Sequence, residues 1–126
     1  MEKYQKIIYV AGPVTSPDGI LNEQYENIHK ARQVAVELWK EGYTVFCPHM
    51  NSMFMDGIIP HDDWYKRDLV ILERCDAVVL CEGWQDSRGS KIERARAEEL
   101  GIPVAETTFA GWKECLAMAL RDRERG

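Results

Sequence analysis

The sequence predicts an α/β fold, a three-layer flavodoxin- or Rossmann-like arrangement with a small parallel sheet of strand order 2-1-3-4. Short apolar runs alternate along the chain with segments in which apolar residues recur at helical spacing. Strands that alternate with helices are joined by right-handed crossovers, which place helices on both faces of a parallel sheet. The length of 126 residues is typical of one domain, so we expect a single domain over residues 1–126.

Four apolar runs are the expected strands. The first stops at Gly12-Pro13 and the second at Pro48, which indicates short buried strands by length and punctuation. Pro103 lies in the last run, and because proline cannot donate a ladder hydrogen bond, we expect that strand at or near an edge of the sheet. The expected strands are residues 6–11, 43–47, 76–81 and 102–105.

Four segments are expected to be helices. In the first, apolar residues recur at steps of three and one, and Gly42 follows in the position that commonly ends a helix. Asp62 or Asp63 is expected to cap the second helix, and the tail 121–126 is expected to fray. The expected helices are residues 23–41, 61–74, 89–100 and 109–120, with a loop over 14–22 and a partly structured loop over 49–60.

The composition excludes several classes of function. Lys and Arg number 16 against 21 Asp and Glu, and the net charge of −5 disfavours duplex nucleic acid, which needs a clustered basic face. The apolar runs are too short to span a membrane and residues 1–6 show no secretory leader, so we expect a cytoplasmic protein. The cysteines lack zinc-finger and C-x-x-C spacing, so we expect buried thiols at Cys47, Cys75, Cys81 and Cys115.

In sheets of this type the ligand crevice lies outside the carboxyl ends of the strands, where the strand order reverses. The rule selects the loops that begin at Gly12, Pro48 and Glu82. The first loop lacks both the G-x-G-x-x-G pattern and a Walker A lysine, so a dinucleotide or triphosphate is poorly supported, although Gly12 permits close approach of a ligand. The candidate binding residues of the first two loops are Gly12, Pro13, His49 and Asn51.

The third loop has the chemistry of an anion site. Ser87 and Gly89 stand where a helix begins, so backbone N–H groups and the helix dipole favour a negative charge there. Arg88 and Lys91 add two cations within the same turn. Glu93 follows six residues after Ser87, at a depth from which its carboxylate can reach the crevice.

Glu93 also has a purely structural interpretation. The segment Ser90 to Glu93 reads S-x-x-E, the capping-box pattern, in which Glu93 would only tie down the backbone N–H of Ser90. Spacing alone leaves both interpretations open. Trp84, in the preceding loop, is a candidate to stack on a base, and Trp64 could do the same or pack in the core.

Asp68 lies inside the helix that precedes the third strand and is either a site carboxylate or an exposed one paired with a nearby arginine. Asp76, at the start of that strand, is expected to be a cap or turn residue. The irregular spacing of His49 and His61 with their polar neighbours does not indicate a metal site. We therefore expect no metal and no organic cofactor.

Four motifs, in this order, resemble the nucleoside 2-deoxyribosyltransferase superfamily, which includes the 2′-deoxynucleoside 5′-monophosphate N-glycosidases. The resemblance covers most of residues 7–105 and is specific for the superfamily rather than for one reaction. The motifs are Y-x-A-G-P at 9–13, G-Y-x-V-x-x-P at 42–48, D-L-x-x-L-x-x-C-D-A-V-V-L at 68–80 and G-W-x-x-S-x-G-x-x-x-E at 83–93.

The resemblance implies roles for individual residues. The nucleophile of characterised relatives falls on Glu93, and the serine that contacts a 5′-phosphate falls on Ser87, with Gly89 beside it. The aspartate that supports sugar binding and base departure matches Asp68, and the first-strand tyrosine matches Tyr9. Residues 48–60 carry no alignable motif, so selectivity for a base stays open.

The expected function is cleavage of the N-glycosidic bond of a nucleoside or deoxynucleoside 5′-monophosphate through a Glu93 nucleophile, by hydrolysis or base transfer. The alternatives are a deoxyribosyltransferase on free nucleosides and a non-catalytic nucleotide-binding module. A homodimer or higher homo-oligomer is expected, since the resembling family completes its sites across subunits. The apolar residues Met50, Met53, Phe54 and Met55 also look too exposed for a monomer.

Overall fold

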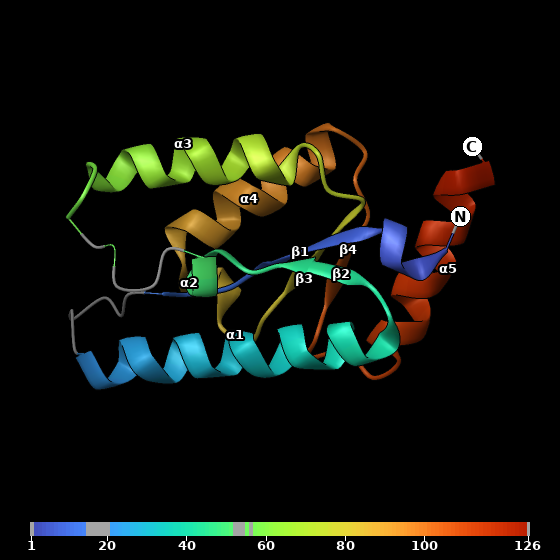
Figure 1. Ribbon diagram of the computed structural model, residues 1–126, viewed down its shortest axis with the longest axis horizontal. Helices are drawn as coiled ribbons and strands as arrows, with labels where there is room; N and C mark the ends of the chain where they lie inside the picture. Colours follow the sequence, from blue (N-terminus) through green and yellow to red (C-terminus); the bar gives the residue numbers. More distant parts are fainter. Residues whose placement is uncertain (1, 15–20, 52–54, 56, 126) are drawn as a thin grey trace.

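The computed structural model describes residues 2–14, 21–51, 55 and 57–125 (Figure 1). It contains a four-stranded parallel sheet in the order β2-β1-β3-β4, which confirms the expected α/β fold and strand order. The strands are β1 (Ile7–Ala11), β2 (Thr44–Phe46), β3 (Ala77–Leu80) and β4 (Val104–Glu106). The helices are η1 (Lys3–Gln5), α1 (Leu21–Glu41), α2 (Pro48–Asn51), α3 (His61–Leu72), η2 (Trp84–Asp86), α4 (Arg88–Glu99) and α5 (Trp112–Arg125).

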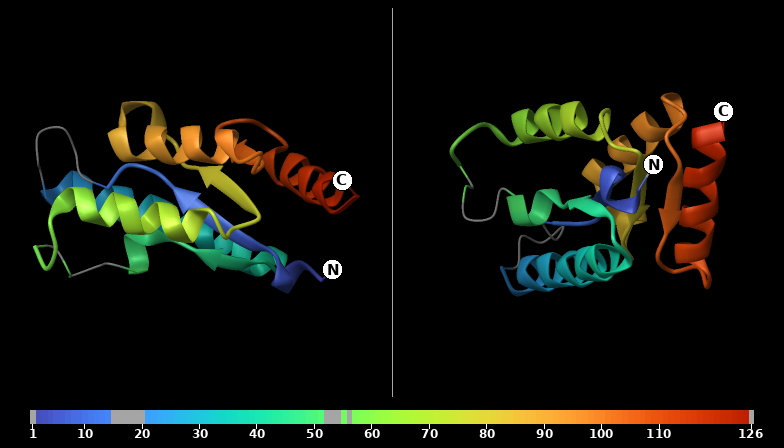
Figure 2. Two further views of the ribbon diagram at one scale, coloured as in Figure 1. Left: turned by 90° about the horizontal axis from the view of Figure 1, so that it is seen from above. Right: turned by 45° about the vertical axis from the view of Figure 1, so that its right-hand side comes forward.

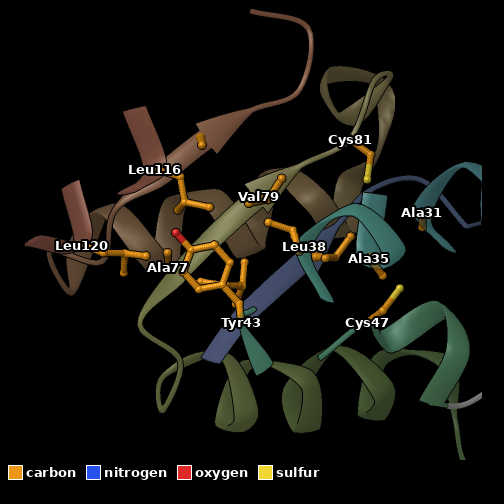
Figure 3. Packing of buried hydrophobic residues seen from close by; sticks show 13 residues of the cluster. Ala31, Ala35, Leu38, Tyr43, Cys47, Ala77, Val79, Cys81, Leu116 and Leu120 are labelled. Carbon is orange, nitrogen blue, oxygen red and sulfur yellow. The ribbon is translucent and has the colours of Figure 1, made fainter. Parts of the chain in front are cut away.

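The helices cover both faces of the sheet and make three layers (Figures 1 and 2). One face packs against α1 and α5 through a cluster that includes Ile8, Val10, Leu38 and Leu116 (Figure 3). The other face packs against α3 and α4 through a second cluster of buried residues, which includes Tyr9, Ala11, Leu72 and Ala97. Because side chains alternate along a strand, Tyr9 of β1 points to the α3/α4 face.

Several expectations about local structure were wrong. Pro60 occupies the N-cap position of α3, and neither Asp62 nor Asp63 caps the helix with its side chain. Both aspartates lie in the first turn, where a negative charge interacts favourably with the helix dipole. Cys115 is exposed rather than buried, because it lies on the outer side of α5. Residues 48–51 form the short helix α2 within the expected loop over 49–60. Of the expected loop over 14–22, residues 15–20 lie outside the described residues.

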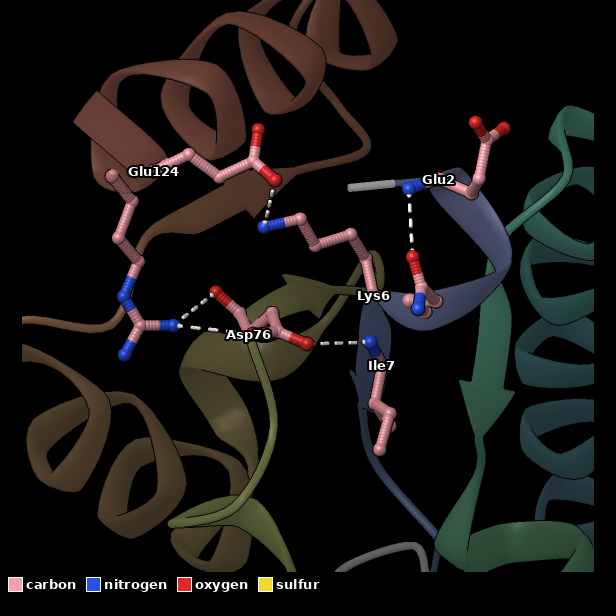
Figure 4. A network of polar contacts seen from close by, with 7 residues as sticks. Glu2, Lys6, Ile7, Asp76 and Glu124 are labelled. Atoms are coloured by element: carbon pink, nitrogen blue, oxygen red, sulfur yellow. Dashed lines mark hydrogen bonds and ion pairs between the residues drawn. The ribbon is translucent and has the colours of Figure 1, made fainter.

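The carboxyl-terminal segment is helical to Arg125 instead of frayed, because polar contacts fix it to the sheet (Figure 4). Asp76 accepts a hydrogen bond from the backbone N–H of Ile7 at 2.7 Å, and Arg123 donates to the Asp76 carbonyl at 2.9 Å. Lys6 pairs with Glu124 at 3.0 Å. Asp76 was expected to be a cap or turn residue; in the structure it holds the starts of β1 and β3 together.

Candidate active site

Glu93 lies on the side of α4 that faces the sheet. Its exposed fraction is only 8%, and the buried residues of α4 are Gly89, Ser90, Glu93 and Ala97, which recur at steps of one, three and four. This stripe is the packing face of the helix. A carboxyl group on a packing face must find polar partners or lose its charge.

Two further acidic or phenolic groups face Glu93 from other elements. Tyr9, on β1, has no exposed surface, and burial followed by the charges of Glu93 and Asp68 raises the pKa of its hydroxyl. Asp68 comes from α3, the neighbouring helix on the same face of the sheet. The structure therefore brings together Tyr9, Asp68 and Glu93, which are 25 or more residues apart in sequence.

The two carboxyl groups of this cluster hold protons more tightly than usual. Burial raises the pKa of Glu93 to about 8, and the charge of Asp68 raises it while the Tyr9 hydroxyl lowers it. Burial raises the pKa of Asp68 to about 6. Between these values the pair carries one proton, which the two carboxyls share as a coupled system.

The Tyr9 hydroxyl is buried and makes no hydrogen bond within the part of the chain that the structure describes. It nevertheless lies close enough to Glu93 for hydrogen bonding between the two side chains to lower the pKa of Glu93 and raise that of Tyr9.

The start of α4 is where the sequence predicts an anion site. Ser87 is the N-cap, with extended backbone, and its side chain accepts a hydrogen bond from the Ser90 N–H at 3.2 Å. The neighbouring Asp86 is exposed, whereas Ser87 is half-buried. Arg88 lies 3.6 Å from Asp62, but both side chains are mostly exposed, so this ion pair is weak.

Tyr65 is a site residue that the sequence analysis missed. A Cβ on Gly89 would lie 2.5 Å from the Tyr65 ring, so the absence of a side chain at Gly89 lets the ring lie against the start of α4. Burial raises the pKa of the Tyr65 hydroxyl and the charges of Glu93 and Asp68 contribute to that rise, which places Tyr65 at the same cluster. Its position one turn before Asp68 on α3 was the available signal.

The first loop is packed against the third. A Cβ on Gly12 would lie 2.8 Å from the Cβ of Cys81, and Gly83, at φ +89°, lies against the Pro13 ring. His49 is buried, and its Nε2 lies 2.9 Å from the Pro13 carbonyl oxygen. Because a carbonyl only accepts hydrogen bonds, Nε2 carries the proton. Burial lowers the pKa of His49, which keeps the ring neutral.

The remaining candidate binding residues differ in whether their side chains already contact other groups of the protein. The Trp84 indole N–H donates to Glu106 at 2.8 Å, and the Arg94 guanidinium lies 4.8 Å from the ring centroid. His49 is similarly engaged by Pro13, whereas Asn51 is exposed at the end of α2. Substrate contacts by Trp84, His49 and Asn51 remain predictions.

In the described ranges, no three His, Cys, Asp or Glu side chains are grouped so that they could hold a metal ion. Likewise, none of the described helices has the length and apolar character needed to cross a membrane.

Residues 6–106 match a family described as the domain of unknown function DUF4406. The chain belongs to this family. No curated protein sequence matches the DUF4406 chain.

Solved structures with the same fold include a 2-deoxyribosyltransferase from the psychrotolerant bacterium Bacillus psychrosaccharolyticus. It aligns with a TM-score of 0.59 and 23% identity, over 87% of this chain and 90% of the other. A 2-deoxyribosyltransferase from Leishmania mexicana aligns with a TM-score of 0.53 and 20% identity, over 80% of this chain; the DUF4406 chain spans 63% of that protein. The solution structure of BlsM aligns with a TM-score of 0.62 and 17% identity, over 97% of this chain and 76% of the other. The deoxyribosyltransferase-like fold expected from the sequence resemblance is therefore confirmed.

Proposed function

We propose that this DUF4406 protein, as a single domain over residues 1–126, cleaves the N-glycosidic bond of a nucleoside or deoxynucleoside 5′-monophosphate. The observation that carries the proposal is the position of Glu93, a buried carboxyl on the packing face of α4 that is grouped with Tyr9 and Asp68. Two carboxyl groups with separated pKa values are what glycoside cleavage requires, one as nucleophile and one as acid. The fold shared with two 2-deoxyribosyltransferases supports the same class of chemistry.

In the proposed reaction an ionised Glu93 oxygen attacks C1′ of the sugar and forms a glycosyl ester. The bond between C1′ and the base nitrogen breaks, and its electron pair leaves with the base. Asp68 donates its proton to the departing base. After this step Asp68 is ionised and Glu93 is bonded to C1′ as an ester. Water or a second base then attacks C1′ and gives its proton to the Asp68 carboxylate, while the ester bond between C1′ and the Glu93 oxygen breaks. This step releases ionised Glu93 and gives hydrolysis or base transfer. The atoms and charges balance without a metal or organic cofactor.

The proton shared by Asp68 and Glu93 sets which form of the site reacts. The reactive form has Glu93 ionised and Asp68 protonated, although burial favours the proton on Glu93 in the empty site. Donors that approach the Glu93 carboxylate shift the proton toward Asp68. The Tyr9 hydroxyl, which has no other partner among the described residues, is one such donor.

The proposed preference for a 5′-phosphate rests on the start of α4. Ser87 is a neutral side chain at a helix N-terminus, where the dipole and backbone N–H groups favour an anion. Asp86, which would repel a phosphate, is exposed in η2.

Deoxyribosyl transfer between free nucleosides is the second candidate. The observation that favours it is the fold shared with the Bacillus enzyme, which is described as a biocatalyst for the synthesis of nucleosides. The two candidates share Glu93 as nucleophile and differ in the substrate's 5′ group.

One incubation series tests the proposal and separates the candidates. The full chain is incubated with matched nucleosides and 5′-monophosphates, each with and without a second free base, and released base is measured by chromatography. The proposal expects base from monophosphates in preference to nucleosides. Base exchange on nucleosides alone would support the second candidate, and tight binding without base release would indicate a binding module.

A further inference from the structure

Ser90 carries a buried hydroxyl that the reaction described above does not use. The exposed fraction of Ser90 is 1%, and its Oγ has no hydrogen-bond partner in the described part of the chain. The backbone N–H of Ser90 is already served, because it donates to Ser87. An unpaired buried hydroxyl is costly, and an alanine at this point of a helix would avoid that cost.

The helix places Ser90 beneath Glu93. The two residues are three apart on α4, so they lie on the same face, and both are buried. Side chains on a helix lean toward its N-terminus, so the Glu93 carboxyl extends over the turn that contains Ser90. A serine hydroxyl rotates freely about its Cβ–Oγ bond and can donate to an acceptor that arrives above it.

The surroundings of Glu93 supply few hydrogen-bond donors for an ionised carboxylate. An ionised carboxylate has about four acceptor positions, whereas a protonated one needs fewer partners. Among the described residues, the Tyr9 hydroxyl is one donor near Glu93, and the Asp68 carboxyl is another while it holds the shared proton. Four described side chains face Glu93 or feel its charge. They are Tyr9 on β1, Tyr65 and Asp68 on α3, and Cys47 after β2.

We propose that Ser90 is a positioning residue for Glu93: when Glu93 ionises, the Ser90 hydroxyl donates a hydrogen bond to its carboxylate. With Tyr9 it gives that carboxylate two donors, one from the sheet and one from its own helix. The bond stabilises the ionised form of Glu93 and restricts the direction of its free oxygen. The inference concerns the proposed active site and rests on the proposed role of Glu93.

A titration tests the proposal without requiring turnover. The full chain is labelled with ¹³C at glutamate side-chain carboxyls, and the Glu93 signal is assigned by its loss in Glu93→Gln. Removing a donor from a carboxylate raises its pKa, so Ser90→Ala is expected to move the Glu93 midpoint upward by about one pH unit. Ser90→Cys keeps the side-chain volume with a weaker donor and is expected to move the midpoint by less.

Unfolding and activity measurements separate positioning from packing. Ser90→Ala is expected to be at least as stable as the wild type toward urea, since it removes an unpaired buried hydroxyl. Its kcat/KM for base release at pH 7 is expected to fall about ten-fold, with the alkaline limb of the pH profile, which follows the pKa of Glu93, displaced to higher pH.

An unchanged Glu93 midpoint in Ser90→Ala overturns the proposal. If that variant does not fold, an unchanged midpoint in Ser90→Cys overturns it instead. Absence of base release by the wild type on every substrate would contradict the proposed function, but the titration would still decide the role of Ser90.

Discussion

The Ser87 hydroxyl accepts a hydrogen bond from the backbone N–H of Ser90 at 3.2 Å, and this bond makes Ser87 the N-cap of α4. The sequence allowed Ser90 to be the cap, with Glu93 as the closing residue of an S-x-x-E capping box. With Ser87 in that position, Glu93 lies more than one turn inside the helix. The capping interpretation of Glu93 is therefore wrong, and its carboxyl is available to the site.

The shared proton predicts a bell-shaped dependence of kcat/KM on pH. Below about pH 6 both Asp68 and Glu93 are protonated and no nucleophile is present; above about pH 8 both are ionised and no acid remains. Activity is therefore expected to be highest between these values. Initial rates of base release across pH 5 to 9.5 measure the two limbs in the range where both groups titrate.

Asp68→Asn provides the control for that profile. The amide donates no proton to the base, so the rate is expected to fall, and the alkaline limb is expected to disappear because only Glu93 still titrates. The acid limb should move from about pH 6 toward the pKa of Glu93, which lies near 8 through burial and somewhat lower without the charge of Asp68. A profile with both limbs unchanged in Asp68→Asn would remove Asp68 from the mechanism.

The identity of residue 87 is predicted to set the preference for a 5′-phosphate. Aspartate is also a good N-cap, so Ser87→Asp should keep α4 intact while placing a negative charge against the phosphate. The ratio of kcat/KM for a monophosphate to that for its nucleoside is expected to fall at least about ten-fold, as loss of one charged hydrogen bond implies. Ser87→Asn, which caps equally well without charge, should keep most of the preference. Equal ratios in the two variants would contradict the assignment.

The contact between Gly89 and Tyr65 is predicted to couple the two helices energetically. Because a Cβ at residue 89 would lie 2.5 Å from the ring, Gly89→Ala is expected to destabilise the fold by about 1–3 kcal/mol despite the better helix propensity of alanine. Truncation of the ring in Gly89→Ala/Tyr65→Ala should recover part of that loss. Urea unfolding of both single variants and the double variant closes the cycle. Additive losses would show that the ring does not meet the new methyl group.

The chain is predicted to form a homodimer or larger homo-oligomer. Met50 and Met55 are 41% and 42% exposed and Ile58 is 68% exposed, which leaves apolar side chains on the segments around α2 without cover in one chain. Met53 and Phe54 of the same run lie outside the described residues. Light scattering at micromolar concentration is expected to give at least twice the chain mass.

A pair of exposed apolar positions supplies the control for assembly. Ile58→Lys is expected to lower the mass toward that of one chain, whereas Met118→Lys, at a 57% exposed position on α5, should not. A stable monomer in the wild type would show that the exposed side chains near α2 serve another purpose.

Most of the sheet could be predicted from sequence because buried parallel strands leave a simple signal. The apolar runs around Ile8 and Val79 are short and uninterrupted, and the alternation with helices fixes their order. The helix α2 left no such signal, since four residues make barely one turn and show no periodicity. The tail was expected to fray because no local pattern reveals what holds it. The contact between Arg123 and Asp76 joins residues 47 positions apart in sequence.

The candidate site was predictable only in part, for a related reason. Glu93 and Ser87 share one helix start, so their spacing could be read directly. Tyr9 and Asp68 lie close together only because α3 and α4 pack on the face of the sheet to which Tyr9 points. Tyr65 was missed because its contact with Gly89 crosses between helices, where no periodic pattern records it.

Replacement of Glu93 by a neutral residue is predicted to leave the fold intact and more stable at high pH. Because the folded-state pKa is about 8, above the ordinary 4.5, ionisation of Glu93 opposes folding, and its cost grows as pH rises from 4.5 to about 8. Glu93→Gln carries no such charge, so its advantage in thermal unfolding should increase over this range and level off above it. A lower melting temperature at pH 8 would mean that the ionised carboxylate is already well paired.

The rate of base release by the wild type, Glu93→Gln and Glu93→Ala tests the central claim most directly. With a nucleoside 5′-monophosphate, both variants are predicted to lose at least about a thousand-fold in kcat while their unfolding transitions remain cooperative. Turnover near the wild-type rate in either variant would contradict it, because a nucleophile that forms the glycosyl ester cannot be dispensable.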